Sequence, residues 1–576
     1  MDKPGVLSET MASLVRFIDV LAKLNDDASS LSLPTLELLR GLLGRAEKEV
    51  EASKNAHLPA VRLPPEILQY IFRLASQKVK DPPHLPSNAT MAAGDIWSFV
   101  EPIPAKAATI ASVCRRWRSV ALADSTLWNL ISDRRDRRPL TVSRQYESTA
   151  LELRLRASPS HAVRTLLESA GHRVKAIEWD RANAGVGDLD VLAASACRLD
   201  KLVLSMSRHL PAVDAQTLTR CFAAQAPSLR QLTLRDCAAL PDSHFPRLTG
   251  LHLDVCPGPN ACDSLLGLLA RAPNLTDLVL SRLQMPDASP DMPAPVALPY
   301  LRRLVFVDMA RGGITSFLLH VDLPDETSIR IHASQHAVPN ASVDAQLFAA
   351  LARTPALRDA SDLYVSGEGD IFVAGRAAAV CFVQQSERGT VGQRRASPQA
   401  PAWDAHIVLR HVLASARIRK LWLVGDSEGI VDPRRNSGIP ALAPSVDTVV
   451  VQDVALPAAL HALERRAVLS PLSGGESSVD PDESAASSRS ITVHVLMTRF
   501  MSVGVVLSKL AQHPDAKNGH VVIGYQPAYK GDRAPPSGFE GSFASLRFVA
   551  HEEEPRVALP EVCAAPAHCL WPAWAE

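Results

Sequence analysis

The sequence predicts two kinds of structure in one chain, an α-helical N-terminal part followed by a longer α/β region of repeated strand and helix units. Up to about residue 131, apolar residues recur three or four positions apart, as they do along one side of a helix. Beyond that point, short stretches of alternating leucines recur, and such alternation is typical of strands. The predicted fold class is therefore α+β, with the longer region an α/β repeat.

The repeated strand motif has the form Leu-x-x-Leu-x-Leu. It occurs as LDKLVL, LRQLTL, LTGLHL, LTDLVL and LRRLVF, which start at Leu199, Leu229, Leu248, Leu275 and Leu301. Successive starts are 30, 19, 27 and 26 residues apart, close to the roughly 20 to 29 residues of a leucine-rich repeat. Weaker copies start at Leu363, Val446, Val521 and Leu546. Residues 133–576 are therefore predicted to form an irregular leucine-rich α/β solenoid that exposes one face of a parallel sheet, and an irregular α/β domain is the alternative.

The segments between these strands supply helices and turns. Helical spacing of apolar residues is found in Ala215–Ala224, Ala261–Arg271, Val343–Arg353 and Ala405–Ala416. Cys237 and Cys256 each lie three residues past the last leucine of a motif, where a small side chain satisfies the backbone of a tight turn. Two stretches rich in Ser, Gly, Pro and charge, 384–399 and 470–490, are predicted to be flexible insertions.

Two amphipathic helices are predicted before residue 57. Residues 7–24 and 35–53 both carry leucines and other apolar residues three or four positions apart, and residues 29–34 separate them. Sustained heptads are missing, which favours a helical hairpin over residues 1–57 rather than the alternative, an oligomerising coiled coil.

A three-part helical segment follows. Leu63 begins the stretch LPPEILQYIFRLAS, in which a proline pair and Glu66 are typical of a helix start. Its apolar residues are predicted to form one stripe: Ile67, Leu68, Ile71, Phe72 and Ala75. A second amphipathic helix is predicted over Ile110–Val120, which contains VCRRWR. A third apolar cluster closes the segment with Leu127, Trp128, Leu130 and Ile131.

The combination of LPPEIL-x-x-IF, VCRRWR and a following Leu-Trp pair resembles the F-box module of fungal F-box proteins, over Val61 to about Ile131. The resemblance implies a three-helix module, within residues 58–132, that binds a Skp-type adaptor and through it a cullin of the SCF ubiquitin ligase. In F-box families a leucine-rich region commonly recruits the target protein. The residues that the resemblance assigns to adaptor contact or nearby packing are Leu63, Pro64, Ile67, Leu68, Ile71, Val113, Cys114 and Trp117.

One departure from the compact module is a Pro-rich insertion, residues 78–105, between the first two helices. We expect a surface loop here, because the entropy of closing a loop rises only logarithmically with its length, by about 0.6 kcal/mol per doubling. Such a loop could also cover the docking face. The alternative for the whole segment is an ordinary helical subdomain whose apolar stripes pack only internally.

Charge and cysteine usage narrow the class of protein. Lys plus Arg and Asp plus Glu number 61 each. The net charge is therefore zero, and no overall electrostatic field favours binding to nucleic acid or to an anionic membrane. The nine cysteines are scattered, without a Cys-x-x-Cys pair or metal spacing, and no apolar run approaches a membrane span. We expect reduced thiols, no metal, no cofactor, and a cytoplasmic or nuclear location.

One motif raises the question of catalysis. Residues Gly425–Gly429 read GDSEG after an apolar stretch, as in the nucleophile elbow of a hydrolase. The elbow needs a helix directly afterwards, whereas IVDPRRNSGIP carries two prolines and no helical period. We therefore expect no enzyme. The F-box resemblance implies instead a target-binding subunit of a ubiquitin ligase, and the alternative is a leucine-rich interaction or structural protein outside any ligase.

Overall fold

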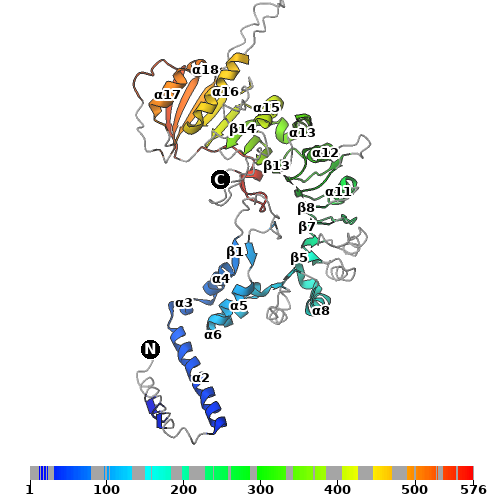
Figure 1. Ribbon diagram of the computed structural model, residues 1–576, viewed down its shortest axis with the longest axis vertical. Coiled ribbons are helices and arrows are strands. Elements are labelled where there is room, and N and C mark those ends of the chain that lie inside the picture. The colour runs from blue at the N-terminus through cyan, green and yellow to red at the C-terminus, as the bar shows by residue number, and fades with distance from the viewer. Residues whose placement is uncertain are drawn as a thin grey trace, which may run out of the picture. The chain divides into compact units, whose positions relative to one another are not determined.

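The computed structural model describes residues 32–79, 96–97, 100–102, 104–132, 150–156, 159–182, 198–206, 228–237, 239–256, 261–285, 295–332, 341–366, 370–383, 405–425, 445–469, 490–498, 501–526, 529, 536–552 and 555–574, with single positions between 12 and 23. The chain divides into two units (Figure 1). Unit 1 combines Met1–Gln77 with Ile103–Trp128, and unit 2 combines Lys78–Pro102 with Asn129–Glu576. The predicted boundaries at residues 57 and 132 stay predictions.

Unit 1 is helical in its described part. Its helices are α2 (Leu33–Ala56), α3 (Pro59–Arg62), α4 (Pro65–Ala75), α5 (Pro104–Val113), α6 (Arg115–Ala123) and the 3₁₀ helix η2 (Ser125–Trp128). Helix α2 covers the helix predicted over residues 35–53. The helix predicted over residues 7–24 lies largely outside the described residues.

Two predictions for unit 1 are wrong. The single helix expected over Ile110–Val120 is two helices, because Cys114 is extended, with φ −156° and ψ 171°, and caps the start of α6. The third apolar cluster is divided, since Leu127 and Trp128 belong to η2 whereas Leu130 and Ile131 lie in β3 (Leu130–Ser132), the first strand of the sheet of unit 2.

Unit 2 is a mixed α/β structure with one large sheet. After β3, its strands are β4 (Leu151–Leu155), β5 (Val174–Ala182), β6 (Lys201–Met206), β7 (Gln231–Arg235), β8 (Gly250–Asp254), β9 (Asp277–Ser281), β11 (Arg303–Val307), β13 (Ser328–His332), β14 (Ala360–Ser366), β15 (Ile371–Gly375), β16 (Ala379–Val383), β17 (Lys420–Val424), β18 (Thr448–Gln452), β19 (Thr492–Met497), β20 (His520–Tyr525) and β21 (Ser545–Ala550). Two small sheets pair β1 (Gln77–Val79) with β2 (Val100–Pro102) and β10 (Val296–Ala297) with β12 (Val321–Asp322).

The helices and 3₁₀ helices of unit 2 lie between these strands, except for the last one. They are α8 (His161–Ala170), η3 (Gly171–Arg173), α11 (Ala261–Ala270), α12 (Arg311–His320), α13 (Ala341–Arg353), α14 (Pro355–Arg358), α15 (Ala405–Ser415), η7 (Asp453–Ala455), α16 (Leu456–Leu469), α17 (Val503–Ala511), α18 (Pro514–Lys517) and α19 (Glu561–Ala564). Three of the four predicted helices match α11, α13 and α15, and residues 215–224 lie outside the described residues.

Strand pairing follows chain order except at one place. The pairings run in one line, in which β16, β15 and β14 follow β13 before β17, and no described strand joins β3 to β21, so the sheet is open. Only β15 pairs antiparallel with its neighbours among these strands. All five predicted leucine motifs and the four weaker copies coincide with strands.

Four neighbouring turns share one backbone conformation. Asp236, Val255, Arg282 and Asp308 directly follow β7, β8, β9 and β11, and all have φ between 49° and 51°. Each donates its backbone N–H to the last residue of the next strand, at 2.9 to 3.3 Å. The left-handed conformation disfavours residues other than glycine, so its recurrence marks a regular turn. Cys237 and Cys256 come next, and their thiols donate to strand carbonyls as predicted.

The two faces of the sheet are covered by different parts of the chain. One face, here called the helix-covered face, packs its leucines against the helices; Leu232, Leu251, Leu278 and Leu304 are in register across it and have no exposed surface. Helices α11, α12 and α13 lie along this side in Figure 1. The opposite face, which the helices between the strands do not cover, is here called the helix-free face; the short helix α19 lies in the segment after the last strand.

Two predictions about the helix-free face are wrong. The insertion 78–105 is not only a surface loop, because Ile96 is buried against this face and the Trp97 indole N–H donates to Thr233 Oγ1 at 3.1 Å. The face is also not exposed along its middle, because residues 555–574, here called the C-terminal segment, cover it with Trp571 and Trp574. Neither contact leaves a periodic pattern in the sequence.

Candidate docking surface

The helix that carries the predicted contact residues is α4. Pro64 precedes the helix and Pro65 is its first residue, where a missing backbone N–H forfeits no intrahelical hydrogen bond. The carboxylate of Glu66 lies in the first turn, where it favours the positive end of the helix dipole. At the other end the backbone N–H of Ser76 donates to the Phe72 carbonyl at 2.9 Å. The predicted helix start at Leu-Pro-Pro-Glu is therefore confirmed.

The apolar residues of α4 face two directions rather than one. Leu68 and Phe72 are 1% exposed, and the Phe72 ring lies 4.9 Å from the ring of Trp117 on α6. A second set of four residues, spaced three, one and three positions apart, faces outward. Their side chains are 40 to 61% exposed: Ile67, Tyr70, Ile71 and Leu74. We call this second set the docking stripe. Because successive helical residues lie about 100° apart, the single predicted stripe divides into a packed row and an exposed row.

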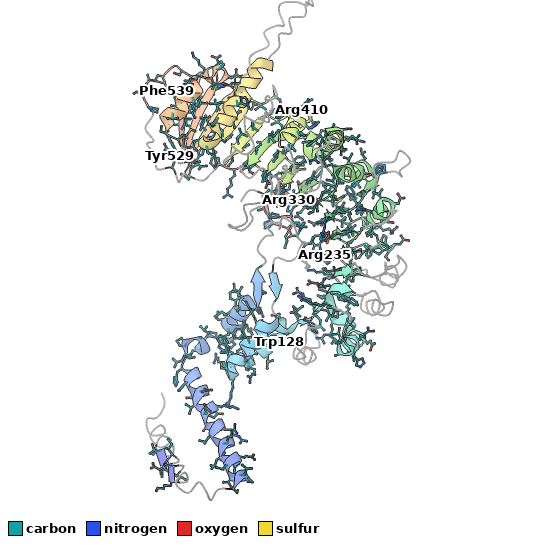
Figure 2. All side chains as sticks on the ribbon, viewed as in Figure 1. Trp128, Arg235, Arg330, Arg410, Tyr529 and Phe539 are labelled. Carbon is teal, nitrogen blue, oxygen red and sulfur yellow. The ribbon has the colours of Figure 1, made fainter. Side chains whose placement is uncertain are left out.

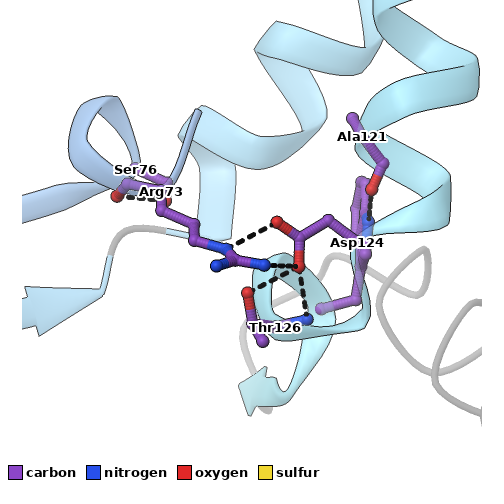
Figure 3. A network of polar contacts seen from close by, with 6 residues as sticks. Arg73, Ser76, Ala121, Asp124 and Thr126 are labelled. Atoms are coloured by element: carbon purple, nitrogen blue, oxygen red, sulfur yellow. Dashed lines mark hydrogen bonds and ion pairs between the residues drawn. The ribbon is translucent and has the colours of Figure 1, made fainter. Parts of the chain in front are cut away.

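A polar network fixes α4 against the end of α6. The Arg73 guanidinium donates to both carboxylate oxygens of Asp124, at 2.8 and 3.2 Å (Figure 3). The backbone N–H and the hydroxyl of Thr126 donate to the same carboxylate. Burial alone would raise the pKa of Asp124, but the hydrogen bonds from Arg73 and Thr126 outweigh burial and lower that pKa below its usual value. The ionised carboxylate thus links α4 and η2.

Two arginines of the VCRRWR motif contact neighbouring parts of unit 1. Arg116 donates to the backbone carbonyl of Leu63 at 2.8 Å, just before α4. Arg115 pairs with Glu49 of α2 at 2.7 Å, and both side chains are well exposed, so this pair contributes little to stability. The Cys114 sulfur accepts the Trp117 backbone N–H at 3.4 Å and caps α6.

The structure separates the predicted contact residues into three groups. Pro64, Ile67, Ile71 and Val113 are exposed, Leu63, Cys114 and Trp117 are half-buried, and Leu68 is buried. Leu68 therefore packs inside the unit in this structure and shapes the surface only from beneath. Prediction from the sequence missed Tyr70 and Leu74, although the spacing of Ile67, Tyr70, Ile71 and Leu74 follows one side of a helix and could have identified them.

The described residues show no metal cluster and no membrane-spanning helix. No group of three or more His, Cys, Asp and Glu side chains among them is placed to hold a metal ion. Along the described part of the chain, no helix combines the length and apolarity needed to cross a bilayer. Gly425 ends β17 with φ +80°, and its N–H donates to Gln452 Oε1 at 2.7 Å. The rest of the GDSEG motif lies outside the described residues.

Comparisons with known proteins place this chain in no family. No protein-family model matches it, and no curated protein matches it either.

Proposed function

We propose that this chain is a non-catalytic substrate-receptor subunit of an SCF-type ubiquitin ligase. In this proposal, the parts of residues 58–132 that belong to unit 1 form an F-box module that binds a Skp-type adaptor and through it a cullin. The observation that carries the proposal is the docking stripe, four large apolar side chains exposed along one side of α4. Contiguous exposed apolar side chains are typical of protein interaction sites.

The energy available from this stripe is sufficient for a specific contact. Fully burying one large apolar side chain contributes about 1.5 to 3 kcal/mol. The four side chains start 40 to 61% exposed, so covering all of them supplies several kcal/mol toward binding. Val113 is a further exposed apolar side chain of unit 1. The packed row and the Arg73–Asp124 pair hold α4 in place, which lowers the entropy lost on binding.

For unit 2 we propose a leucine-rich solenoid that binds the target protein. Strands that pair largely in chain order, with the recurring turns at Asp236, Val255, Arg282 and Asp308, support this proposal. A receptor of this kind performs no bond chemistry. It raises the effective concentration of the target near the ligase.

The docking stripe gives a direct test. We expect the full-length chain, co-expressed with a Skp-type adaptor and a cullin, to co-purify with both. The double variant Ile67→Asp and Ile71→Asp should lose at least 100-fold in adaptor affinity, because charges cannot be buried in an apolar contact without a partner. Both positions are exposed, so the variant should keep its helical circular dichroism signal.

The matched control is Tyr300→Asp, which introduces the same charge at an apolar residue of unit 2 that is 58% exposed. Its adaptor affinity should equal that of the unchanged chain. Undiminished adaptor binding by the double variant would contradict the assigned stripe. Absence of any adaptor binding by the unchanged chain would favour an interaction protein outside the ligase.

A further inference from the structure

The C-terminal segment covers the helix-free face of unit 2 over several strands. Val557 packs near Trp422, Val450 and Leu496 on β17, β18 and β19. Further along the chain, the thiol of Cys563 donates to Ser328 Oγ of β13 at 3.3 Å. Two indoles follow within a cluster that also contains Val279, Val305 and Phe372; these indoles belong to Trp571 and Trp574, whose side chains are nearly or fully buried.

This segment adds no strand to the sheet. Its backbone bonds are mostly internal, such as Trp571 N–H to the His568 carbonyl at 2.8 Å and Trp574 N–H to the Cys563 carbonyl at 3.1 Å. One backbone bond leaves it among the described residues, from Cys569 N–H to the Ile96 carbonyl at 3.0 Å. The ladder from β3 to β21 is complete without the segment, so side chains are what attach it.

Polar groups on the helix-free face and in the segment are poorly satisfied. Buried side-chain atoms without a hydrogen-bond partner among the described residues are His252 Nδ1 and Nε2, Ser281 Oγ, His332 Nδ1, His568 Nε2 and Trp574 Nε1. A buried polar group that lacks a partner destabilises the covered state. By contrast, burying an indole removes a large apolar area from water, which stabilises that state. The indoles hold the segment, and the unsatisfied polar groups offset part of that gain.

We propose that the helix-free face from β8 to β19 is a peptide-binding groove, that the C-terminal segment is its built-in occupant, and that an aromatic-bearing segment of the target replaces it. This proposal rests on the proposed function for the identity of the partner as a ligase target. The chemistry of the partner follows from the occupant: one or two indole or phenyl rings for the sites of Trp571 and Trp574, and polar groups able to pair with His252, Ser281 and His332. Because the occupant is tethered, it competes at an effective concentration near the millimolar range.

Exchange of the occupant is the first test. A specific protease site placed in the full-length chain between Glu552 and Pro555 allows the segment to be cut while it stays in place. A fluorescent peptide of residues 555–574 should then replace the cut segment. Fluorescence anisotropy measures binding of the labelled peptide, and mass spectrometry measures loss of the cut segment. The same peptide carrying Trp571→Ala and Trp574→Ala should bind at least tenfold more weakly. Failure of the labelled peptide to enter, or unfolding of the cut protein, would overturn the proposal.

Hydrogen exchange on the uncut chain is the second test. The chain is unchanged in this experiment, so a misfolded variant cannot explain the result. We expect the amides of Cys569 and Trp574 to exchange at least 100-fold faster than those of Leu251 and Leu278, because the segment opens without unfolding the sheet. Equal protection at both places would mean that the segment is a permanent part of the core, and it would overturn the proposal.

The chemistry of the partner is tested with a displayed random-peptide library. The bait is the cut full-length protein with its segment in place, and bound peptides are eluted with the 555–574 peptide. Aromatic-bearing peptides that this competitor elutes support the groove, whereas no competitor-sensitive enrichment overturns it. Adaptor binding through α4 is measured on the same samples. Retained adaptor binding with no exchange would remove only the groove, and exchange without adaptor binding would remove only the ligase assignment.

Discussion

The two faces of the large sheet are both buried along its middle, yet they are closed by different means. The helix-covered face is closed by leucines and by helices from several of the connections between its strands. The helix-free face is closed by Ile96, Trp97 and the C-terminal segment, which are hundreds of residues from many of the strands they touch. The first face is almost wholly apolar, whereas the second buries histidines and arginines beside its valines.

This difference separates what holds the fold from what covers it. Leucines in register repeat the same contact from strand to strand, so each strand stabilises the next one in the sheet. Figure 2 labels two residues of the other face, Arg235 on β7 and Arg330 on β13. Arg330 donates to His332 at 3.2 Å, and its guanidinium carbon lies 6.0 Å from the ring centre of Trp574. The proposed exchange of the C-terminal segment depends on this mixed composition.

The largest effect is expected on the helix-covered face. Leu278→Ala removes a side chain with no exposed surface from the middle of the leucine rows. We expect the free energy of unfolding to fall by about 2 to 5 kcal/mol, since the cavity left behind refills only in part. Denaturant unfolding followed by circular dichroism measures it. Tyr300→Ala, at an exposed site, is the control, and a loss under about 1 kcal/mol for Leu278→Ala would remove the distinction between the faces.

The second-largest effect is expected at acidic pH, which should weaken the packing of the helix-free face. Burial lowers the pKa of His568 and of His494 to about 4 from an ordinary 6.5, and it lowers the pKa values of His252 and His332 well below that ordinary value. These imidazoles are neutral when folded, so their contribution is complete above about pH 6.5 and is lost as the pH falls toward 4.

For His568 alone, the expected loss between pH 7.5 and pH 5 is on the order of 1 to 2 kcal/mol, from 1.36 kcal/mol per pKa unit. The segment should be released first, as measured by cleavage with an acid-tolerant protease over this range. His568→Asn should make the dependence less steep, because His252, His332 and His494 still contribute, while His461→Asn, on α16, should leave it unchanged. A flat profile for the unchanged chain would contradict neutral burial.

Most of the helix-covered face could be predicted from the sequence, and the helix-free face could not. Leu-x-x-Leu-x-Leu places leucines on one side of a strand by local geometry alone, and β7, β8, β9 and β11 all appear where the motif predicts them. Trp571 and Trp574 lie in no periodic pattern. Their burial depends on contacts with strands about 200 to 300 positions earlier, which spacing along the chain does not encode.

The candidate docking surface was also predicted only in part from the sequence, although the contacts concerned lie closer together along the chain. The proline pair and Glu66 identified the start of α4, because capping is local. The break at Cys114 was missed, since a cysteine before three arginines and a tryptophan also fits a continuous amphipathic helix. The order of β14, β15 and β16 was not predicted either, because a hairpin inserted into a parallel sheet depends on pairing that the strand sequences do not specify.

The smallest effect is expected where the helix-free face is only half-buried. Arg154 of β4 and Glu178 of β5 are register partners, their side chains pair at 2.8 Å, and they are 20% and 18% exposed. Because water still reaches this pair, we expect a coupling of about 0.5 to 1 kcal/mol. A double-mutant cycle with Arg154→Ala and Glu178→Ala measures that coupling apart from other contacts of either residue. A coupling above about 2 kcal/mol would mean that this end of the face is as strongly closed as its middle, so the contrast with the segment-covered strands would fail there.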